Sequence, residues 1–174
     1  MAKTRIAWDE TLSAAANARL RLPELVGEYF GEGRRLAAGD PGPAEFHAFR
    51  LRTKRWRYTL EMFRSIYGAS LDRHLAALRR AQTFLGDLND CAVTRVLILR
   101  TMPAASPQRR RIERYLDERA AALRAAFLSY WRGEFDAAGE EARWRAYLSR
   151  RRRGEAKRPA PRVRRSPPPP SGPQ

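Results

Sequence analysis

The sequence has little that could form a disulfide framework or a membrane span. It contains one cysteine, Cys91, in 174 residues, which excludes an internal disulfide and is compatible with a reducing compartment. No apolar run is long enough to cross a bilayer, and the first ten residues, MAKTRIAWDE, lack the hydrophobic region of a secretory signal. We therefore expect a cytoplasmic protein that makes no membrane contact.

Acidic residues are also scarce. There are 35 Lys and Arg against 19 Asp and Glu, a formal charge of +16. Nine of the cations lie from Arg150 onward, with Glu155 as the one acid there, so residues 150–174 carry +8 and residues 1–149 carry the other +8. A charge of this size attracts nucleic acid, polyphosphate or anionic lipid headgroups. The 150–174 tail is rich in Arg and Pro, cannot bury a core and is predicted to be disordered.

Helical spacing dominates residues 8–149, and no segment has a partner with which it could form a sheet. The sequence predicts an all-α domain over 8–149, an antiparallel up-down bundle with a basic surface groove. Asp9 is the expected cap of the first helix, Pro23 the start of the second, and Ser70 the cap of a later one. Gly86 is expected to break or bend that later helix. The expected helices are 10–21, 23–38, 44–67, a segment from 70 interrupted near 86, 91–100, 107–131 and 134–151.

The segment 44–67 carries two neighbouring stripes. One is apolar and suits a core; the other holds His47, Arg50, Lys54 and Arg57, with Glu61 as the one counter-charge. A solvated helix face usually mixes Lys and Glu at i, i+4, whereas these cations repel one another unless a polyanion lies along them. Arg offers a planar fork to phosphate oxygens, Lys a compact charge, and His47 could donate a further hydrogen bond. We call these four residues the basic row.

Other residues near the basic row have two interpretations. Arg64 could extend it, Arg79 and Arg80 could line a facing wall, and Arg114 and Arg124 could contribute from a later helix, but a plain surface charge explains each equally well. Tyr58 and Glu61 are predicted to support the row, because Glu61 follows Arg57 at i+4 and can hold its guanidinium. His74 lies on another helix without such company and is assigned no role.

Asp87, Asn89 and Asp90 resemble a cluster of oxygen ligands. Their position beside Gly86 favours helix caps or partners for arginines over a metal site, and the closely spaced series of a calcium loop is absent. The sequence therefore predicts no metal and no cofactor.

Two motifs together identify a family resemblance. The string F-H-x-F-R-x-x-x-K-R-x-R-Y-x-x-E-x-F over 46–63 is followed by L-x-x-L-x-x-x-Q-x-x-L-G-D-L-N-D over 75–90. This pair resembles the CHAD domain family, the conserved histidine α-helical domain. The resemblance implies a helical module that binds inorganic polyphosphate through basic side chains, in some cases beside a CYTH-type protein or on a polyphosphate granule.

The chain departs from that family in its number of basic helices. A full member resembles two related bundles that line a shared groove, whereas this sequence has one His/Arg/Lys helix. The resemblance covers roughly Leu22–Leu148 and looks like the C-terminal half. Three explanations stay open: a naturally short member, a fragment, or a homodimer whose two copies complete the groove.

Two other functions compete with polyphosphate binding. A phosphoryl-processing enzyme would use His47 as acceptor or base, but the sequence lacks a phosphate-cradling glycine-rich loop and an acidic two-metal cluster. A nucleic-acid-binding protein would use the tail, which binds any polyanion non-specifically and with strong salt dependence. We expect a binding module rather than an enzyme.

Overall fold

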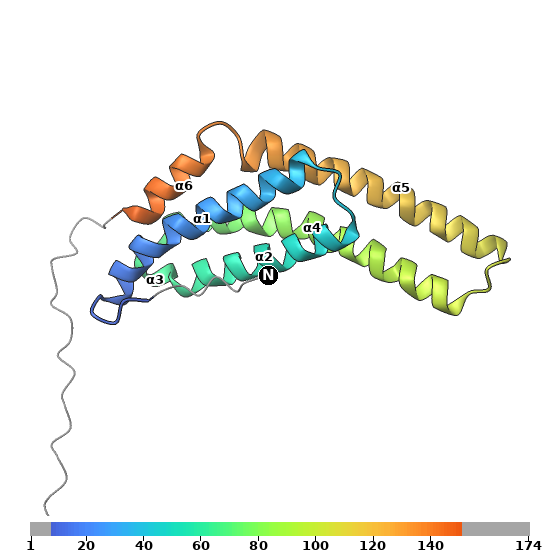
Figure 1. Ribbon diagram of the computed structural model, residues 1–174, viewed down its shortest axis with the longest axis horizontal. Helices are drawn as coiled ribbons and strands as arrows, with labels where there is room; N and C mark the ends of the chain where they lie inside the picture. Colours follow the sequence, from blue (N-terminus) through green and yellow to red (C-terminus); the bar gives the residue numbers. More distant parts are fainter. Residues whose placement is uncertain (1–7, 151–174) are drawn as a thin grey trace, which may run out of the picture.

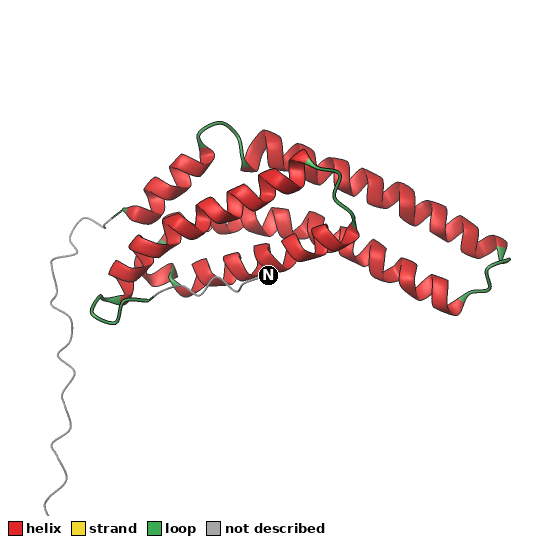
Figure 2. Ribbon diagram, in the orientation of Figure 1, coloured by secondary structure: helices red, strands yellow, loops and turns green. Residues whose placement is uncertain are grey.

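The computed structural model describes residues 8–150, and this part of the chain is entirely helical, as the sequence predicts. The tail predicted to be disordered lies outside the described residues from 151 onward. In chain order the elements are α1 (Ala14–Ala38), α2 (Pro43–Met62), the short α3 (Arg64–Tyr67), a 3₁₀ turn (Ala69–Leu71), α4 (Asp72–Thr101), α5 (Pro107–Tyr130), a π-helical turn (Trp131–Phe135) and α6 (Glu140–Ser149) (Figures 1 and 2).

The four long helices α1, α2, α4 and α5 alternate in direction along the long axis (Figure 1). Helix α6 departs from an up-down order, because it continues in the direction of α5 and packs on α1. The end of α4 and the first half of α5 project together beyond the ends of α1 and α2 (Figure 1). We call this projecting hairpin, residues 91–119, the arm, and the rest of the helices the body.

An aromatic core holds α1, α2 and the π-helical turn together. Trp131 and Phe135 stack with ring centroids 4.7 Å apart, and Trp131 meets Phe49 of α2 edge-on at 5.3 Å. Gly33 of α1 allows this approach, because a Cβ there would lie 1.9 Å from Cζ2 of Trp131. Since Phe49 is held in this core, the adjacent face of α2 that carries the basic row is directed away from it.

The start of α1 differs from the prediction. Asp9 does not cap a helix at residue 10; Ser13 is the N-cap, and its Oγ accepts from the backbone N–H of Ala16 at 3.2 Å. Asn17, fully buried, explains the change: its amide donates to the carbonyl of Asp9 at 2.7 Å, and its Oδ1 accepts from the Asp9 N–H at 2.9 Å. The segment before Ser13 therefore folds back onto α1 instead of continuing it.

Pro23 lies inside α1 and does not begin a separate helix. Ala18, Leu22 and Val26, on both sides of the proline, are fully buried on one continuous face. Packing of that face offsets the backbone hydrogen bond that a proline removes from a helix interior. The sequence-based division of 10–21 from 23–38 is therefore wrong.

The junction between α2 and α4 is also more complex than predicted. The basic helix ends at Met62, and α3 follows after Phe63, up to Gly68 at φ 72°. Ser70 does not cap α4; its hydroxyl lies 3.0 Å from the hydroxyl of Tyr147 in α6. The sequence predicts that Ser70 caps α4, but its hydroxyl instead links the junction between α2 and α4 to α6.

Gly86 does not divide the chain into two helices, because α4 runs without interruption from Asp72 to Thr101. Leu85 on one side of the glycine and Cys91 beyond it are both buried, so the packed face of the helix continues past the glycine. The last helix, in turn, begins at Glu140 and not at 134, since the π-helical turn ends at Phe135 and residues 136–139 form a non-helical turn.

His74, on the first turn of α4, is 2% exposed between two aromatic rings of α6. Its ring stacks on Tyr147 at 4.3 Å and meets Trp144 edge-on at 4.4 Å. Burial lowers the pKa of His74 to about 4, and the neighbouring charge of Arg73 acts in the same direction. The folded protein therefore holds His74 neutral where the unfolded chain would protonate it.

This difference predicts a pH-dependent stability. Because the folded-state pKa is below the usual 6.5, the contribution of His74 is complete above pH 6.5 and is lost as the pH falls to about 4. We expect a loss of about 3 kcal/mol in the free energy of unfolding over that window. Denaturant unfolding between pH 7 and 4 measures it, with His74→Phe as the comparison that keeps an aromatic ring against Tyr147. Equal slopes for the two proteins would contradict the assignment.

Candidate functional site

The basic row lies along the edge where α2 packs against α4. At one end, Nδ1 of His47 is 2.7 Å from Oδ1 of Asn89 in α4. At the other end, Glu61 of α2 accepts from Nη2 of Arg79 in α4 at 3.3 Å. The two helices run antiparallel (Figure 1), so these contacts fix which residues of α4 face the row. The row and the second sequence motif thus form one surface.

Arg57 is the most restrained cation of the row. Its side chain is 17% exposed, its Nη1 donates to Oε1 of Glu61 at 2.5 Å, and its guanidinium lies 4.3 Å from the ring centre of Tyr58. Lys54 Nζ lies 5.8 Å from the same ring. Tyr58 and Glu61 therefore hold cations of the row in place, as the i+4 spacing predicts for Glu61.

Arg50 and Lys54, in the middle of the row, contact no carboxylate among residues 8–150. Another cation of the same helix behaves differently: Arg52 lies 3.0 Å from Glu28 and 3.4 Å from Glu32 of α1. Helix α2 therefore neutralises its cation on the α1 side and leaves two cations unneutralised on the α4 side. This arrangement suits an anion that approaches from outside.

The remaining candidates are distributed unevenly. Arg79 shares Glu61 with the row, whereas Arg64 is paired with Asp72 at 2.9 Å. Arg80 points away from α2: its guanidinium lies over the ring of Tyr130 at 4.5 Å and pairs with Glu134.

Two later cations also lie elsewhere. Arg124 of α5 pairs with Asp40 in the loop between α1 and α2 and lies 5.9 Å from the ring centre of Phe46. Arg114 is exposed on the arm. Of the candidates outside the row, Arg79 is the one that shares a partner with it.

Asn89 is a residue whose contribution the sequence did not reveal. The sequence predicts a helix cap or an arginine partner at this position, but Asn89 lies within α4 and its Oδ1 is 2.7 Å from Nδ1 of His47. The order of the two motifs could have revealed this contact. Consecutive helices that pack together run antiparallel, so the end of the second motif lies beside the start of the first. Asp87 and Asp90 likewise lie inside the helix and not in a loop.

Gly86 lies one turn before Asn89, on the same side of α4. A Cβ built at Gly86 meets no atom within 4 Å, so this position leaves open space in front of the helix. The antiparallel order of α2 and α4 places Arg50 opposite this opening, since His47 is opposite Asn89. An anion at Arg50 would therefore meet no side chain at this position of α4.

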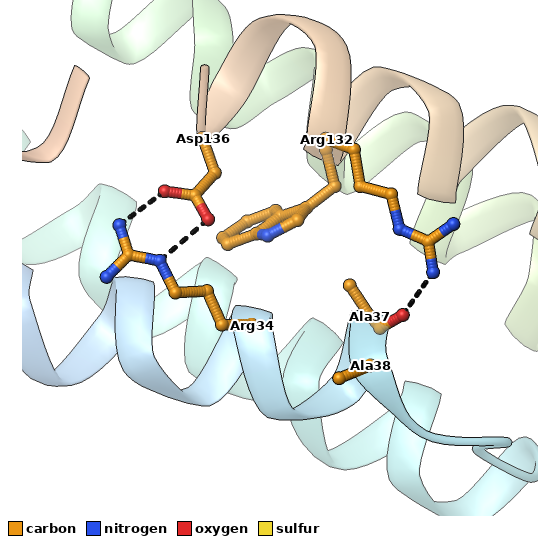
Figure 3. A pocket seen from close by; sticks show the side chains of 6 residues that line it. Arg34, Ala37, Ala38, Arg132 and Asp136 are labelled. Atoms are coloured by element: carbon orange, nitrogen blue, oxygen red, sulfur yellow. Dashed lines mark hydrogen bonds and ion pairs between the residues drawn. The ribbon is translucent and has the colours of Figure 1, made fainter. Parts of the chain in front are cut away.

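A shallow pocket of about 210 Å³ lies elsewhere, between the end of α1 and the π-helical turn (Figure 3). Its charges are already satisfied: Arg34 donates to both oxygens of Asp136, at 2.6 and 2.8 Å, and Arg132 donates to the carbonyl of Ala37. The hydrogen bonds to Asp136, with those to Glu141, raise the pKa of Arg34 above its ordinary value. We assign this pocket no ligand.

The described part of the chain has no helix long and apolar enough to cross a membrane. Within the same residues, no group of three or more His, Cys, Asp or Glu side chains is placed to hold a metal ion.

Comparison with protein families gives a match to this chain. The family model described as the CHAD domain matches residues 2–99, more than half of the chain. The match includes both sequence motifs and ends inside α4, so α5 and α6 lie beyond it. No curated protein and no solved structure matches the chain. The CHAD domain is associated in general with polyphosphate binding.

Proposed function

Because this chain belongs to the CHAD domain family, we propose that it binds inorganic polyphosphate along the basic row of α2. The observation that carries the proposal is the pair Arg50 and Lys54, which contact no carboxylate among the described residues. His47, held by Asn89, and Arg57, held by Glu61, flank that pair. A polymer with a charge on every phosphate can contact all four side chains together.

The fixed orientation of the flanking residues favours tight binding. Side chains that are already held lose less conformational entropy when a ligand binds. Arg79, which shares Glu61 with Arg57, extends the same surface onto α4.

The proposal is one of binding without turnover. His47 has Asn89 as a polar partner, but the row contains no second group arranged to activate a nucleophile. The absence of phosphate release from polyphosphate with added Mg²⁺ would agree with a binding module. Release that His47→Ala abolishes would establish the enzyme instead.

Cellular location and partners belong to the same proposal. A protein that binds polyphosphate through α2 would act in the cytoplasm and could associate with polyphosphate granules or with a CYTH-type protein. A homodimer would add a second row to the first. The competing proposal, a non-specific nucleic-acid-binding protein, rests on the basic tail and gains no support from a described contact.

Removal of the tail separates these two proposals. We expect a chain that ends at Arg150 to bind long-chain polyphosphate with an affinity within about tenfold of the full chain, because it keeps the whole basic row. Titration at ~0.15 M salt, where exposed charges are screened beyond about 8 Å, measures both proteins.

Duplex DNA serves as the competitor in this titration. Loss of polyphosphate binding with the tail, or preference of the full chain for DNA, would contradict binding by the row. The truncated chain also needs a thermal unfolding transition like that of the full chain, which shows that α6 is intact.

A further inference from the structure

The arm exposes an unusual amount of apolar surface for two packed helices. Four large apolar side chains of α4 are 42–60% exposed there: Val93, Val96, Leu97 and Leu99. Val93, Val96 and Leu97 share one side of the helix, whereas Leu99 lies about 160° around the helix from Leu97. We call Val93, Val96 and Leu97 the arm stripe. Cys91, on the side of α4 directed towards α5, is 6% exposed, so the hairpin itself is packed. The stripe is a second apolar face that nothing in residues 8–150 covers.

This face continues the side of α4 that the body buries. Val96 follows Leu85 by eleven residues, about three helical turns, so both point to the same side of the helix. Leu85 belongs to the hydrophobic core of the body and is 1% exposed, whereas Val96 is 47% exposed. The arm therefore consists of two packed helices and lacks a second pair of helices to cover its exposed apolar face. We call this missing second pair the covering pair.

We propose that a second copy of this chain supplies the covering pair, and that the α4 stripes of two arms pack antiparallel across a twofold axis. Two opposite charges at the ends of the stripe favour a second copy of the chain as the partner. Asp90 precedes the stripe and Arg100 follows it; both are exposed, and neither has a partner among the described residues. In a twofold contact, if residue i of one copy contacts residue j of the other, then residue j of the first copy contacts residue i of the second.

One register satisfies both ends of the contact. Paired residue numbers have a constant sum in an antiparallel pair, so a register that places Val93 opposite Leu97 of the second copy also places Asp90 opposite Arg100. The twofold axis repeats both contacts. A stripe with an acid at one end and a base at the other is thus complementary to itself only in the antiparallel order.

The available length agrees with this register. It places Asn89 opposite Thr101, the last residue of α4. Asn89 contacts His47 near the start of α2, so the uncovered stretch of α4 begins where the partner's helix would end. The turn at the tip of the second arm would then lie near the His47 end of the basic row.

Repulsion between the basic arms is small in this arrangement. Residues 91–119 hold seven Arg and three acids, and a parallel pair would bring the two tips together. The antiparallel register places residue 103 beside residue 87, which separates the tips by about 24 Å along the helix. This distance exceeds the screening length of about 8 Å at 0.15 M salt.

The test is the oligomeric state of the full chain without polyphosphate, measured by sedimentation equilibrium at 0.15 M salt. We expect a dimer at about 50 µM. Asp90→Arg alone and Arg100→Asp alone should each weaken dimerisation at least tenfold, about 1.4 kcal/mol, because each creates two like-charge contacts. The double variant Asp90→Arg/Arg100→Asp should restore the dimer, since the two charges are exchanged.

Restoration by the double variant is the readout that a general effect on folding would not produce. Leu97→Glu, at an exposed position, should give a monomer with an unchanged thermal unfolding midpoint. A wild-type monomer at 50 µM would overturn the proposal. A dimer that is insensitive to all four variants, or single variants that the exchange does not rescue, would also overturn it. If the wild type is monomeric and the chain ending at Arg150 dimerises, the tail and not a second copy covers the stripe.

Discussion

The variant Arg50→Ala/Lys54→Ala should bind long-chain polyphosphate about a hundredfold or more weakly than the wild type. Both side chains lie in the middle of the basic row without a carboxylate partner among residues 8–150. Each hydrogen bond to a charged group contributes about 1.5–3 kcal/mol, so loss of two such contacts costs ~3 kcal/mol or more. Neither residue belongs to the buried core, and the free energy of unfolding should change little.

A matched control distinguishes position from charge. The variant Arg55→Ala/Arg73→Ala also removes two cations, and both of these side chains are exposed outside the row. We expect this control to reduce the affinity less than about fivefold, through the weaker long-range field alone. Titrations at several salt concentrations should show a shallower salt dependence for the row variant, because fewer phosphate contacts release fewer counterions. Equal losses in the two double variants would refute a specific row.

The largest expected change in stability follows Trp131→Ala. Trp131 is 1% exposed and contacts aromatic rings of α1, α2 and α5, among them Tyr29 at 5.8 Å and Phe49 at 5.3 Å. It also stacks on Phe135 of its own turn at 4.7 Å. Truncation of a buried tryptophan costs about 3–5 kcal/mol. Denaturant unfolding with circular dichroism measures the loss, and a loss below about 1 kcal/mol would mean that this ring does not hold α1 against the π-helical turn.

Gly33 tests the same contact by the opposite change. Gly33→Ala should cost about 2 kcal/mol, because its Cβ would overlap Cζ2 of Trp131 at 1.9 Å and overpacking costs about 1–3 kcal/mol. In the Trp131→Ala background the same substitution should become neutral or stabilising, since alanine favours a helix by ~1 kcal/mol.

Gly86→Ala is the matched control, because its Cβ meets no atom within 4 Å. It should stabilise the wild type by up to about 1 kcal/mol. Destabilisation of similar size at Gly33 and Gly86 would contradict the packing explanation. The two glycines therefore have opposite expected effects although both lie inside helices.

Long periodic segments of the sequence predicted helices well. The spacing over 107–131 gave α5 to within one residue, and the apolar stripe of α2 includes the buried Phe46, Phe49 and Trp56. Helix boundaries at special residues were predicted less well. Pro23 and Gly86 usually interrupt a helix, yet both lie inside one here, because buried side chains on either side continue the packed face of the helix.

The position of the basic row on α2 could be predicted, but its state of charge pairing could not. Arg52 and Arg50 are two residues apart, and only the packing of α1 shows that Arg52 has acidic partners. Arg80 contacts Tyr130 of α5 and does not face the basic row, and this likewise depends on how α4 is rotated against α5. Such contacts join residues 20 to 54 positions apart, which local patterns do not encode.

The sequence by itself determined that the protein is helical and basic, and that one helix carries cations beside its apolar stripe. These properties follow from composition and from the 3.6-residue period, which depend on neighbouring residues alone. The tertiary structure decided which cations remain without a carboxylate, that Asn89 orients His47, and that the last part of α4 projects with apolar side chains exposed. These features depend on the rotation and register of helices that are distant in the chain, and packing of the whole core sets both.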